Sequence, residues 1–325
     1  MPMNRHMAVV FRVAAGPRVG FGHLLRCRAL ARALGVEPRV SVRGTAATRR
    51  AATALGLTVI DGGPTLLDRE RPDVLVVDDP SATAAGVWVS AARRRGTPVA
   101  TIHDAGLARL DADLVIDGSV RVAARVTTRG RFGPRFAVLD PAVTALRASA
   151  RPRREHILVA VGGGAHVRHL VPPVVAALAR RLPHADIRVA PGFTPGRHPA
   201  LASGTWLAPA DLATTLADAR VAIVAGGLTA YEACALGVPV VAVSVVQAQQ
   251  PTVRALARHG AAVDGGALGT ADAGRRVSAA AARLLREPSR QQRLSMAGRR
   301  LIDGRGAARV ATALRRLAQQ GGRRG

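Results

Sequence analysis

The sequence predicts an α/β protein with two domains, each built around a parallel sheet, and three observations carry that prediction. Short, continuously apolar runs alternate with alanine- and leucine-rich helical stretches, a pattern typical of parallel strands that helices cover on both faces. Both halves of the chain open with a strand, a glycine-rich loop and a helix. A length of 325 residues, 48% of them hydrophobic, suits two domains with a core each.

The first half contains six predicted strands, separated by helical stretches such as "GVWVSAARRRG" (86–96). The strands are "MAVVFRV" (7–13), "RVSVRG" (39–44), "LTVID" (57–61), "DVLVVDD" (73–79), "PVATIHD" (98–104) and "DLVIDG" (113–118). The segment "RASARPRREH" (147–156) is polar, basic and broken by proline, and it therefore indicates a linker.

The second half repeats this pattern. Its predicted strands are "ILVAVGGG" (157–164), "DIRVA" (186–190), "RVAIVAGG" (220–227) and "VPVVAVSVV" (238–246), and its helices include "LVPPVVAALARRL" (170–182), "TAYEACALG" (229–237) and a last one, "AARVATALRRLAQQ" (307–320). Two Rossmann-like domains that face each other leave a cleft lined by the carboxyl ends of both sheets, where ligands bind in such folds.

The net charge of +26 comes from arginine alone, because the chain contains no lysine. Arginine in place of lysine, together with abundant alanine, glycine and valine, is what a GC-rich genome encodes, and we give this explanation the larger share. A basic surface also attracts nucleic acid, but aromatic residues make up only 2% of the chain and leave few rings for bases to stack on. Acidic small ligands such as nucleotide diphosphates fit the charge equally well.

The cysteine pattern and the N-terminus bear on the cellular compartment. Cys27 and Cys234 are far apart and form no CxxC pair, no window approaches the apolar length of a membrane span, and "MPMNRHMAVV" lacks the features of a secretory signal. We therefore expect a cytoplasmic protein with reduced thiols and no stable membrane insertion.

The turn "VGFGH" (19–23) joins the first predicted strand to the first predicted helix. Gly20 and Gly22 allow a sharp turn, after which the helix N-terminal amides can face an anion. A phosphate cradle needs no histidine, so His23 indicates chemistry beside the phosphate. The open alternative is a histidine that caps the helix or is hydrogen-bonded for structural reasons, which is the commoner fate of a single histidine.

Two glycine loops follow strands in the second half. Gly162–Gly164 can form a phosphate nest, with a tight strand-to-helix turn as the open alternative. Gly226 and Gly227 end a later strand and allow close approach of a ligand.

The residues after this second loop carry polar groups in a specific order. Thr229 can donate a hydroxyl hydrogen bond at the start of the helix, and Glu232, one turn on, can accept from a ribose diol. Gln249 follows the next strand. For Glu232 the alternative is a solvated residue favoured by the helix dipole.

These motifs resemble the PseG/SpsG-like family, the UDP-sugar hydrolases of pseudaminic acid biosynthesis and their spore-coat polysaccharide relatives. "RVGFGHLLRCRALARAL" (18–34) is similar to the family's opening motif, and "GPRFAVLDP" (133–141) to its stretch before the second domain. "VGGGAHV", "AIVAGGLTAYEACALGVP", the glutamine cluster and "LIDGRGAARV" follow in family order.

The resemblance covers nearly the whole chain and implies the two-domain GT-B architecture of the MurG-type glycosyltransferases. Residues 1–148 would form the domain on the water or acceptor side, with the catalytic histidine. Residues 149–305 would form the nucleotide-sugar-binding domain. Residues 306–325 would form a helix that crosses back to the first domain and a basic tail.

The resemblance also implies roles for individual residues. His23 would act on the water that attacks the anomeric carbon and releases UDP with inversion, without a metal or a cofactor. Near strand ends, Asp78, Asp79 and Asp104 can orient His23 or a sugar hydroxyl. Candidate substrate-binding residues are Gly20, Gly22, Arg26, Gly163, Gly164, Gly226, Gly227, Thr229, Tyr231, Glu232 and Gln249. Among these, Glu232 would hold the ribose. The glycine loops and Thr229 would lie near the diphosphate, and Gln249 would lie near the sugar or its phosphate.

Three positions depart from the family pattern. Ala14 stands where the family carries an aspartate, two residues after the arginine of the first strand. Pro80 stands at the position of an active-site tyrosine, and Tyr231 is the only tyrosine of the chain. His166 replaces an acidic residue after the middle glycine loop. These departures weaken the expectation of hydrolysis more than that of the fold.

Three functions therefore stay open. The leading one is a UDP-sugar hydrolase that acts on a modified amino sugar in surface glycan synthesis. A glycosyltransferase of the same fold is the second, because the donor-site motifs do not distinguish the two. A catalytically silent nucleotide-sugar-binding protein is the third. The expected partners are the UDP-sugar and other enzymes of the glycan pathway, and not nucleic acid.

Overall fold

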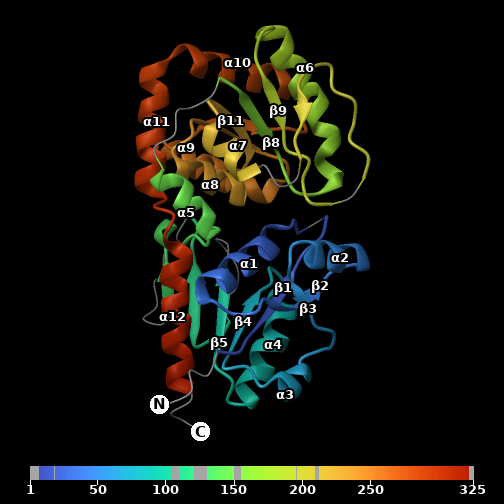
Figure 1. Cartoon of the computed structure of the whole chain (residues 1–325), viewed down its shortest axis with the longest axis vertical. Helices are drawn as coiled ribbons and strands as arrows, with labels where there is room; N and C mark the ends of the chain where they lie inside the picture. Colours follow the sequence, from blue (N-terminus) through green and yellow to red (C-terminus); the bar gives the residue numbers. More distant parts are fainter. Residues whose placement is uncertain are drawn as a thin grey trace. The chain divides into compact units, whose positions relative to one another are not determined.

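The structure, a computed structural model, describes residues 7–17, 19–103, 110–120, 130–149, 155–194, 196–208 and 212–321. The chain divides into two compact units (Figure 1): Met1–Pro141 together with Arg305–Gly325, and Ala142–Gly304. Each unit holds one parallel sheet with helices around it. The predicted α/β class with two parallel sheets is confirmed.

The first unit is built on a sheet with strand order β3-β2-β1-β4-β5-β6-β7. Its strands are β1 (Val9–Ala14), β2 (Arg39–Arg43), β3 (Thr58–Val59), β4 (Val74–Asp78), β5 (Val99–His103), β6 (Leu114–Asp117) and β7 (Gly130–Phe132). Its helices are α1 (Gly22–Leu34), α2 (Ala46–Ala54), α3 (Leu66–Glu70), α4 (Ala82–Arg94), the 3₁₀ helix η1 (Pro134–Phe136) and α12 (Gly306–Gly321). Because β1 pairs with β2 on one side and β4 on the other, the strand order reverses between β1 and β4.

The second unit repeats this topology with the order β10-β9-β8-β11-β12-β13. Its strands are β8 (Ile157–Ala160), β9 (Ile187–Val189), β10 (Thr205–Trp206), β11 (Val221–Ala225), β12 (Val240–Ser244) and β13 (Val263–Ala267). Its helices are α5 (Pro141–Ala148), α6 (Val171–Arg181), α7 (Leu212–Asp218), α8 (Leu228–Leu236), α9 (Gln250–Arg258), α10 (Ala273–Arg286), α11 (Pro288–Leu301) and the 3₁₀ helices η2 (Ala165–Leu170) and η4 (Gln247–Gln249). Here the order reverses between β8 and β11. In such sheets ligands bind outside the carboxyl ends of the strands at the reversal.

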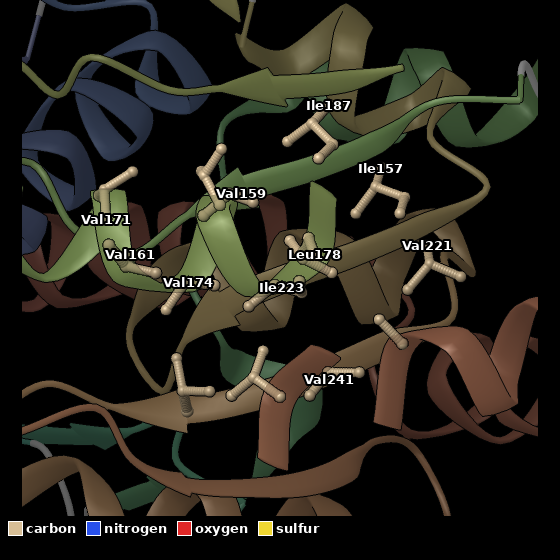
Figure 2. Close-up of a cluster of buried hydrophobic side chains, with 14 of the residues drawn as sticks. Ile157, Val159, Val161, Val171, Val174, Leu178, Ile187, Val221, Ile223 and Val241 are labelled. Atoms are coloured by element: carbon tan, nitrogen blue, oxygen red, sulfur yellow. The ribbon is translucent and has the colours of Figure 1, made fainter. Parts of the chain in front are cut away.

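The core of the second unit explains why its strands are so apolar in sequence. Figure 2 shows Ile157 and Val159 of β8, Ile223 of β11 and Val241 of β12 in one cluster with Leu178 of α6. All five are fully buried. Burying such a side chain contributes roughly 1.5–3 kcal/mol, so the central strands need side chains that are apolar at every position.

Three strands were not predicted, and all three lie at sheet edges. β7 ends the first sheet, while β10 and β13 end the second. An edge strand packs against only one neighbour and is partly solvated, so its sequence lacks a continuous apolar run; none of the residues of β7 is fully buried.

The division into units also differs from the expected boundary at residue 148. Helix α5 ends at that residue but, from Ala142 on, belongs to the second unit. Its Arg147 guanidinium donates to the carbonyls of Ala235, Arg299 and Ile302, at the C-terminal ends of α8 and α11. A cation there is favoured by the helix dipoles, which ties α5 to the second unit.

The last helix, α12, belongs to the first unit and packs against α1 (Figure 1). Its Arg315 donates hydrogen bonds to the carbonyls of Ala33 and Leu34 at the C-terminal end of α1. The chain thus starts and finishes in the same unit.

Candidate active site

The turn between β1 and α1 holds the predicted histidine. Gly16 and Gly20 exchange two backbone hydrogen bonds, of 3.1 and 2.7 Å, and Gly20 adopts a φ of +88°, which favours glycine. His23, the second residue of α1, is 8% exposed. A Cβ at Gly20 or Gly22 would meet no atom of the described residues within 4 Å. Protein packing therefore leaves space beside both glycines.

His23 lies in a hydrogen-bonded group with Arg26 and Asp78. Its Nδ1 is 2.8 Å from Asp78 Oδ1, where β4 ends. Arg26, one turn further along α1, donates two hydrogen bonds to the same carboxylate. Its Nε lies 2.8 Å from Oδ2, and its Nη2 lies 2.6 Å from Oδ1. The structure thus brings together three predicted site residues, two from α1, which follows β1, and one from the end of β4.

The electrostatics of this group favour one tautomer of His23. Burial by itself would raise the pKa of Asp78, but the charges of Arg26 and His23 and the hydrogen bonds from both outweigh it and hold that pKa well below its usual range. Nδ1 also lies 2.7 Å from Arg26 Nη2, yet it cannot accept there while it donates to Asp78. Because the carboxylate is ionised, we assign the proton to Nδ1, which leaves Nε2 as a base.

Arg26 is predicted to bind substrate, and this stays a prediction. In the structure its guanidinium donates to the Asp78 carboxylate, which is the partner of His23. We therefore also interpret Arg26 as a positioning residue for His23.

The neighbouring carboxylate, Asp79, has different partners. Arg43, the last residue of β2, donates to it from Nε at 2.7 Å and from Nη2 at 2.5 Å, and the backbone N–H of Ser81 donates at 2.9 Å. Arg12 of β1 places its Nε 4.0 Å from the same carboxylate. Asp79 is thus held by its own cluster and is not available to His23.

Asp104, another expected site residue of the first unit, lies outside the described residues. Ala14 is fully buried at the end of β1, so it presents only a methyl group there. Pro80 leads into α4 and supplies no hydroxyl.

In the second unit, Gly226 and Gly227 follow β11 and have different surroundings. A Cβ at Gly226 would lie 2.7 Å from Val253 Cγ2 and 3.1 Å from the carbonyl oxygen of Gln249, so packing alone requires glycine there. At Gly227 the nearest atom would be Gln249 Nε2, at 3.7 Å. The backbone at Gly227 is therefore the open side of the loop.

Gln249 closes one side of this loop. Its Oε1 accepts from the backbone N–H of Val245 at 3.0 Å, which leaves its NH₂ group beside Gly227. Helix α8 begins directly after the loop and has no side-chain cap, so its first N–H groups can bind an anion. Thr229 and Glu232 lie three residues apart on one side of α8, and both are half-buried, as is Tyr231.

The middle glycine loop is braced by a neighbouring loop. The carbonyl of Gly163 accepts from the N–H groups of Phe193 and Thr194, at 2.7 and 3.2 Å, while Gly164 precedes η2. Arg168 of η2, only 6% exposed, donates to carbonyls of that neighbouring loop at Pro191, Thr194 and Gly196. Sequence reasoning missed Arg168.

Metal and thiol chemistry find little support among the described residues. No group of three or more histidine, cysteine, aspartate or glutamate side chains there is placed to hold a metal ion. Cys27 and Cys234 are free and buried, and burial raises the pKa of Cys234 to about 12 and, with the Asp78 charge, raises that of Cys27 well above its ordinary value. Within the same described segments, no helix is long and apolar enough to cross a membrane.

Comparisons with known proteins agree with the motifs and the topology. No family model matches the chain. It is 31% identical over 227 residues to the spore coat polysaccharide biosynthesis protein SpsG of Bacillus subtilis (strain 168), an alignment that covers 64% of this chain and 66% of that protein. The alignment supports the expected resemblance to the PseG/SpsG-like family, and the chain spans slightly less than two thirds of the length of SpsG.

Solved structures show the fold of the chain. The spinosyn forosaminyltransferase SpnP superposes with a TM-score of 0.66 at 17% identity, covering 97% of this chain and 100% of that one. MurG of Acinetobacter baumannii gives 0.62 at 17% identity, covering 95% and 99%. MnaA of S. aureus, solved with UDP, gives 0.64 at 12% identity, covering 96% and 97%. The fold is GT-B, as expected.

Proposed function

We propose that this chain is an enzyme of glycan biosynthesis that binds a UDP-sugar in the second unit and activates a nucleophile with His23 in the first. The observation that carries the proposal is the contact between His23 Nδ1 and the buried, ionised Asp78. This contact fixes the ring and leaves Nε2 as the proton acceptor. Kinship with a spore coat polysaccharide biosynthesis protein supports the glycan setting.

The proposed reaction needs only a base and a leaving nucleotide. His23 Nε2 takes a proton from the attacking water, whose oxygen forms a bond to the anomeric carbon. The bond from that carbon to the UDP oxygen breaks, and UDP leaves with the electron pair while the anomeric centre inverts. Asp78 stabilises the imidazolium that forms, and Arg26 keeps the Asp78 carboxylate ionised and aligned.

The nucleotide side of the proposal rests on the loop at Gly227. The open backbone there and the uncapped N-terminus of α8 suit a diphosphate. Glu232 is the proposed ribose ligand and Thr229 a diphosphate ligand, with the Gln249 NH₂ beside them. We propose a cytoplasmic setting because both thiols are free.

A glycosyl transfer is the second candidate. His23 would deprotonate an acceptor hydroxyl by the same step that it uses on water, so the geometry of the first unit suits both nucleophiles. Solved structures of similar fold include transferases named as such, SpnP among them. A silent nucleotide-sugar-binding protein is the third candidate, because Ala14 and Pro80 bring no acid or hydroxyl to the site.

The test is a panel of UDP-, GDP-, CMP- and TDP-sugars incubated with the full chain, with free nucleotide as the readout. Hydrolysis predicts nucleotide release without an acceptor, and transfer predicts release only when acceptor sugars are added. The His23→Ala variant, assayed under the same conditions, is the negative control. Tight binding of a nucleotide sugar without release under either condition would establish the silent binder instead.

A further inference from the structure

Asp78, the last residue of β4, and Asp79, which follows it, lie on opposite faces of the first sheet. Successive side chains of a strand point to opposite sides. Asp78 reaches α1, where His23 and Arg26 bind it, whereas Asp79 reaches Arg12 and Arg43. Arg12 shares its face with Trp88 of α4, since its guanidinium lies 5.0 Å from the centre of that ring. The second cluster is therefore separate from the group around His23.

This second cluster carries more positive than negative charge. The guanidinium groups of Arg12 and Arg43 face a single carboxylate, that of Asp79. The other hydrogen-bond partners of this cluster among the described residues are uncharged. Arg12 Nη1 donates to Ser41 Oγ at 3.1 Å, and the Ser81 N–H donates to Asp79. The net charge of this part of the described chain is thus one positive unit. A buried charge costs free energy unless a group of opposite charge lies beside it.

Arg12 also has an unfilled hydrogen-bonding group. Its side chain is 12% exposed, and its Nε is buried with no hydrogen-bond partner among the described residues. Burial lowers the pKa of Arg12, and the nearby Arg43 charge adds to this against the opposing effect of Asp79. Arg43 donates to Asp79 from Nε and Nη2, and its side chain is 39% exposed, so its Nη1 remains as a further donor.

We propose that Arg12 and Arg43 bind an oxyanion group, a phosphate or a carboxylate, carried by the molecule that accepts the sugar. The acceptor role rests on glycosyl transfer, the second candidate of the proposed function, but the anion site stands on the cluster itself. Guanidinium groups suit such anions because their planar N–H groups pair with two oxygens at once. The cluster lies where β1, β2 and β4 end, which is where ligands bind in sheets of this order. Water alone would need no such site, so the cluster favours transfer to an anionic acceptor.

Trp88 offers a direct reporter of this site. The chain has two tryptophans, and Trp206 lies in the second unit. In a Trp206→Phe background, Trp88 fluorescence can be titrated with inorganic phosphate and, separately, with acetate, each against chloride at equal ionic strength. We expect a saturable change with at least one of the two anions, and the one that saturates at lower concentration identifies the class of group.

Variants then assign the response to the cluster. Arg43→Gln should weaken binding at least tenfold, because one charge-assisted contact is lost. Arg49→Gln is the control, because Arg49 is an exposed arginine of α2 paired with the exposed Asp61. If Arg43→Gln does not fold, Arg43→Lys keeps the charge but loses the planar pairing, and should weaken binding by a smaller factor.

The outcome that overturns the proposal is a response that never saturates, or one that Arg43 and Arg49 variants change equally. Nucleotide release from a nucleotide sugar is measured independently. If nucleotide is released and the anion response is absent, the anion site is wrong while the proposed function stands. If the anion response is present and no nucleotide is released, the proposed function is wrong while the anion site stands.

Discussion

The two sheets share one strand order, yet the residues at their reversals differ in kind. Between β1 and β4, charged side chains meet: His23, Arg26 and Asp78 form a buried hydrogen-bonded group. Between β8 and β11, the loop at Gly226 and Gly227 offers backbone and little side-chain charge. One topology thus provides a charged group able to move a proton and an open loop able to receive an anion.

The strand order of each sheet determines where the candidate site lies, whereas the residues at that position determine its chemistry. Both places are dictated by the reversal of strand order. A base must be held still by partners of opposite charge, whereas a diphosphate needs free N–H groups and no bulk. The first site therefore depends on paired charges, and the proposed diphosphate position of the second on a glycine that carries no side chain.

The largest effect is expected from His23→Ala. Turnover should fall by about 10²–10⁴-fold, the usual contribution of a positioned base, while UDP affinity, measured by calorimetry, stays unchanged because the proposed nucleotide site is in the other unit. His259→Ala, which alters an exposed histidine, is the control. Equal loss of UDP affinity and turnover would contradict the division of roles between the two sites.

Asp78→Asn tests the pairing in the first site. Removing one partner of a buried ion pair costs about 3–5 kcal/mol. Because the folded pKa of Asp78 lies below its unfolded value of about 4, its contribution to stability is present above pH 4 and is lost as the pH falls through the lower, folded value.

Urea unfolding of wild type and Asp78→Asn from pH 7 into the acid range measures this contribution. The difference between the two should be largest near neutrality and shrink in acid. Asp68, whose exposed carboxylate pairs bidentately with Arg95, is the matched control, and Asp68→Asn should change the profile much less. An unaltered acid profile in Asp78→Asn would show that the pair adds nothing to folding.

Glu232→Ala tests the second site. Charge-assisted hydrogen bonds to a ribose contribute roughly 1.5–3 kcal/mol each, so UDP should bind at least tenfold more weakly by calorimetry. Glu155→Ala, at an exposed carboxylate of the same unit, is the control. Unchanged UDP affinity would remove Glu232 from the site.

The smallest effects are expected from alanine substitutions at one glycine of each site, Gly226 and Gly22. Gly226→Ala forces a contact of 2.7 Å with Val253, and overpacking of this kind costs about 1–3 kcal/mol of stability. Gly22→Ala meets no described atom within 4 Å, so its free energy of unfolding should rise by about 0.4–1 kcal/mol, because alanine loses less backbone freedom on folding than glycine. Thermal unfolding of both variants measures the difference, and equal destabilisation would contradict the open space at Gly22.

The sequence by itself determined the α/β class, the two-unit organisation and the glycine loops. The reason is that central parallel strands are buried on both faces and must be apolar throughout, as in β8 and β11. His23 could be singled out because a turn that needs only glycine also carried an imidazole. The edge strands β7, β10 and β13 escaped detection, since a partly solvated strand does not need an apolar run.

Only the tertiary structure decided which charged groups meet. In sequence Asp78 and Asp79 are adjacent and equivalent, but the alternation of side chains along a strand sends one to His23 and the other to Arg43. Arg43 ends a strand, and Arg12 interrupts the apolar run "MAVVFRV"; that interruption was the available signal for a functional arginine. Pairings of this kind join residues more than 30 positions apart, and no local pattern records them, because they depend on which strands are neighbours in the sheet.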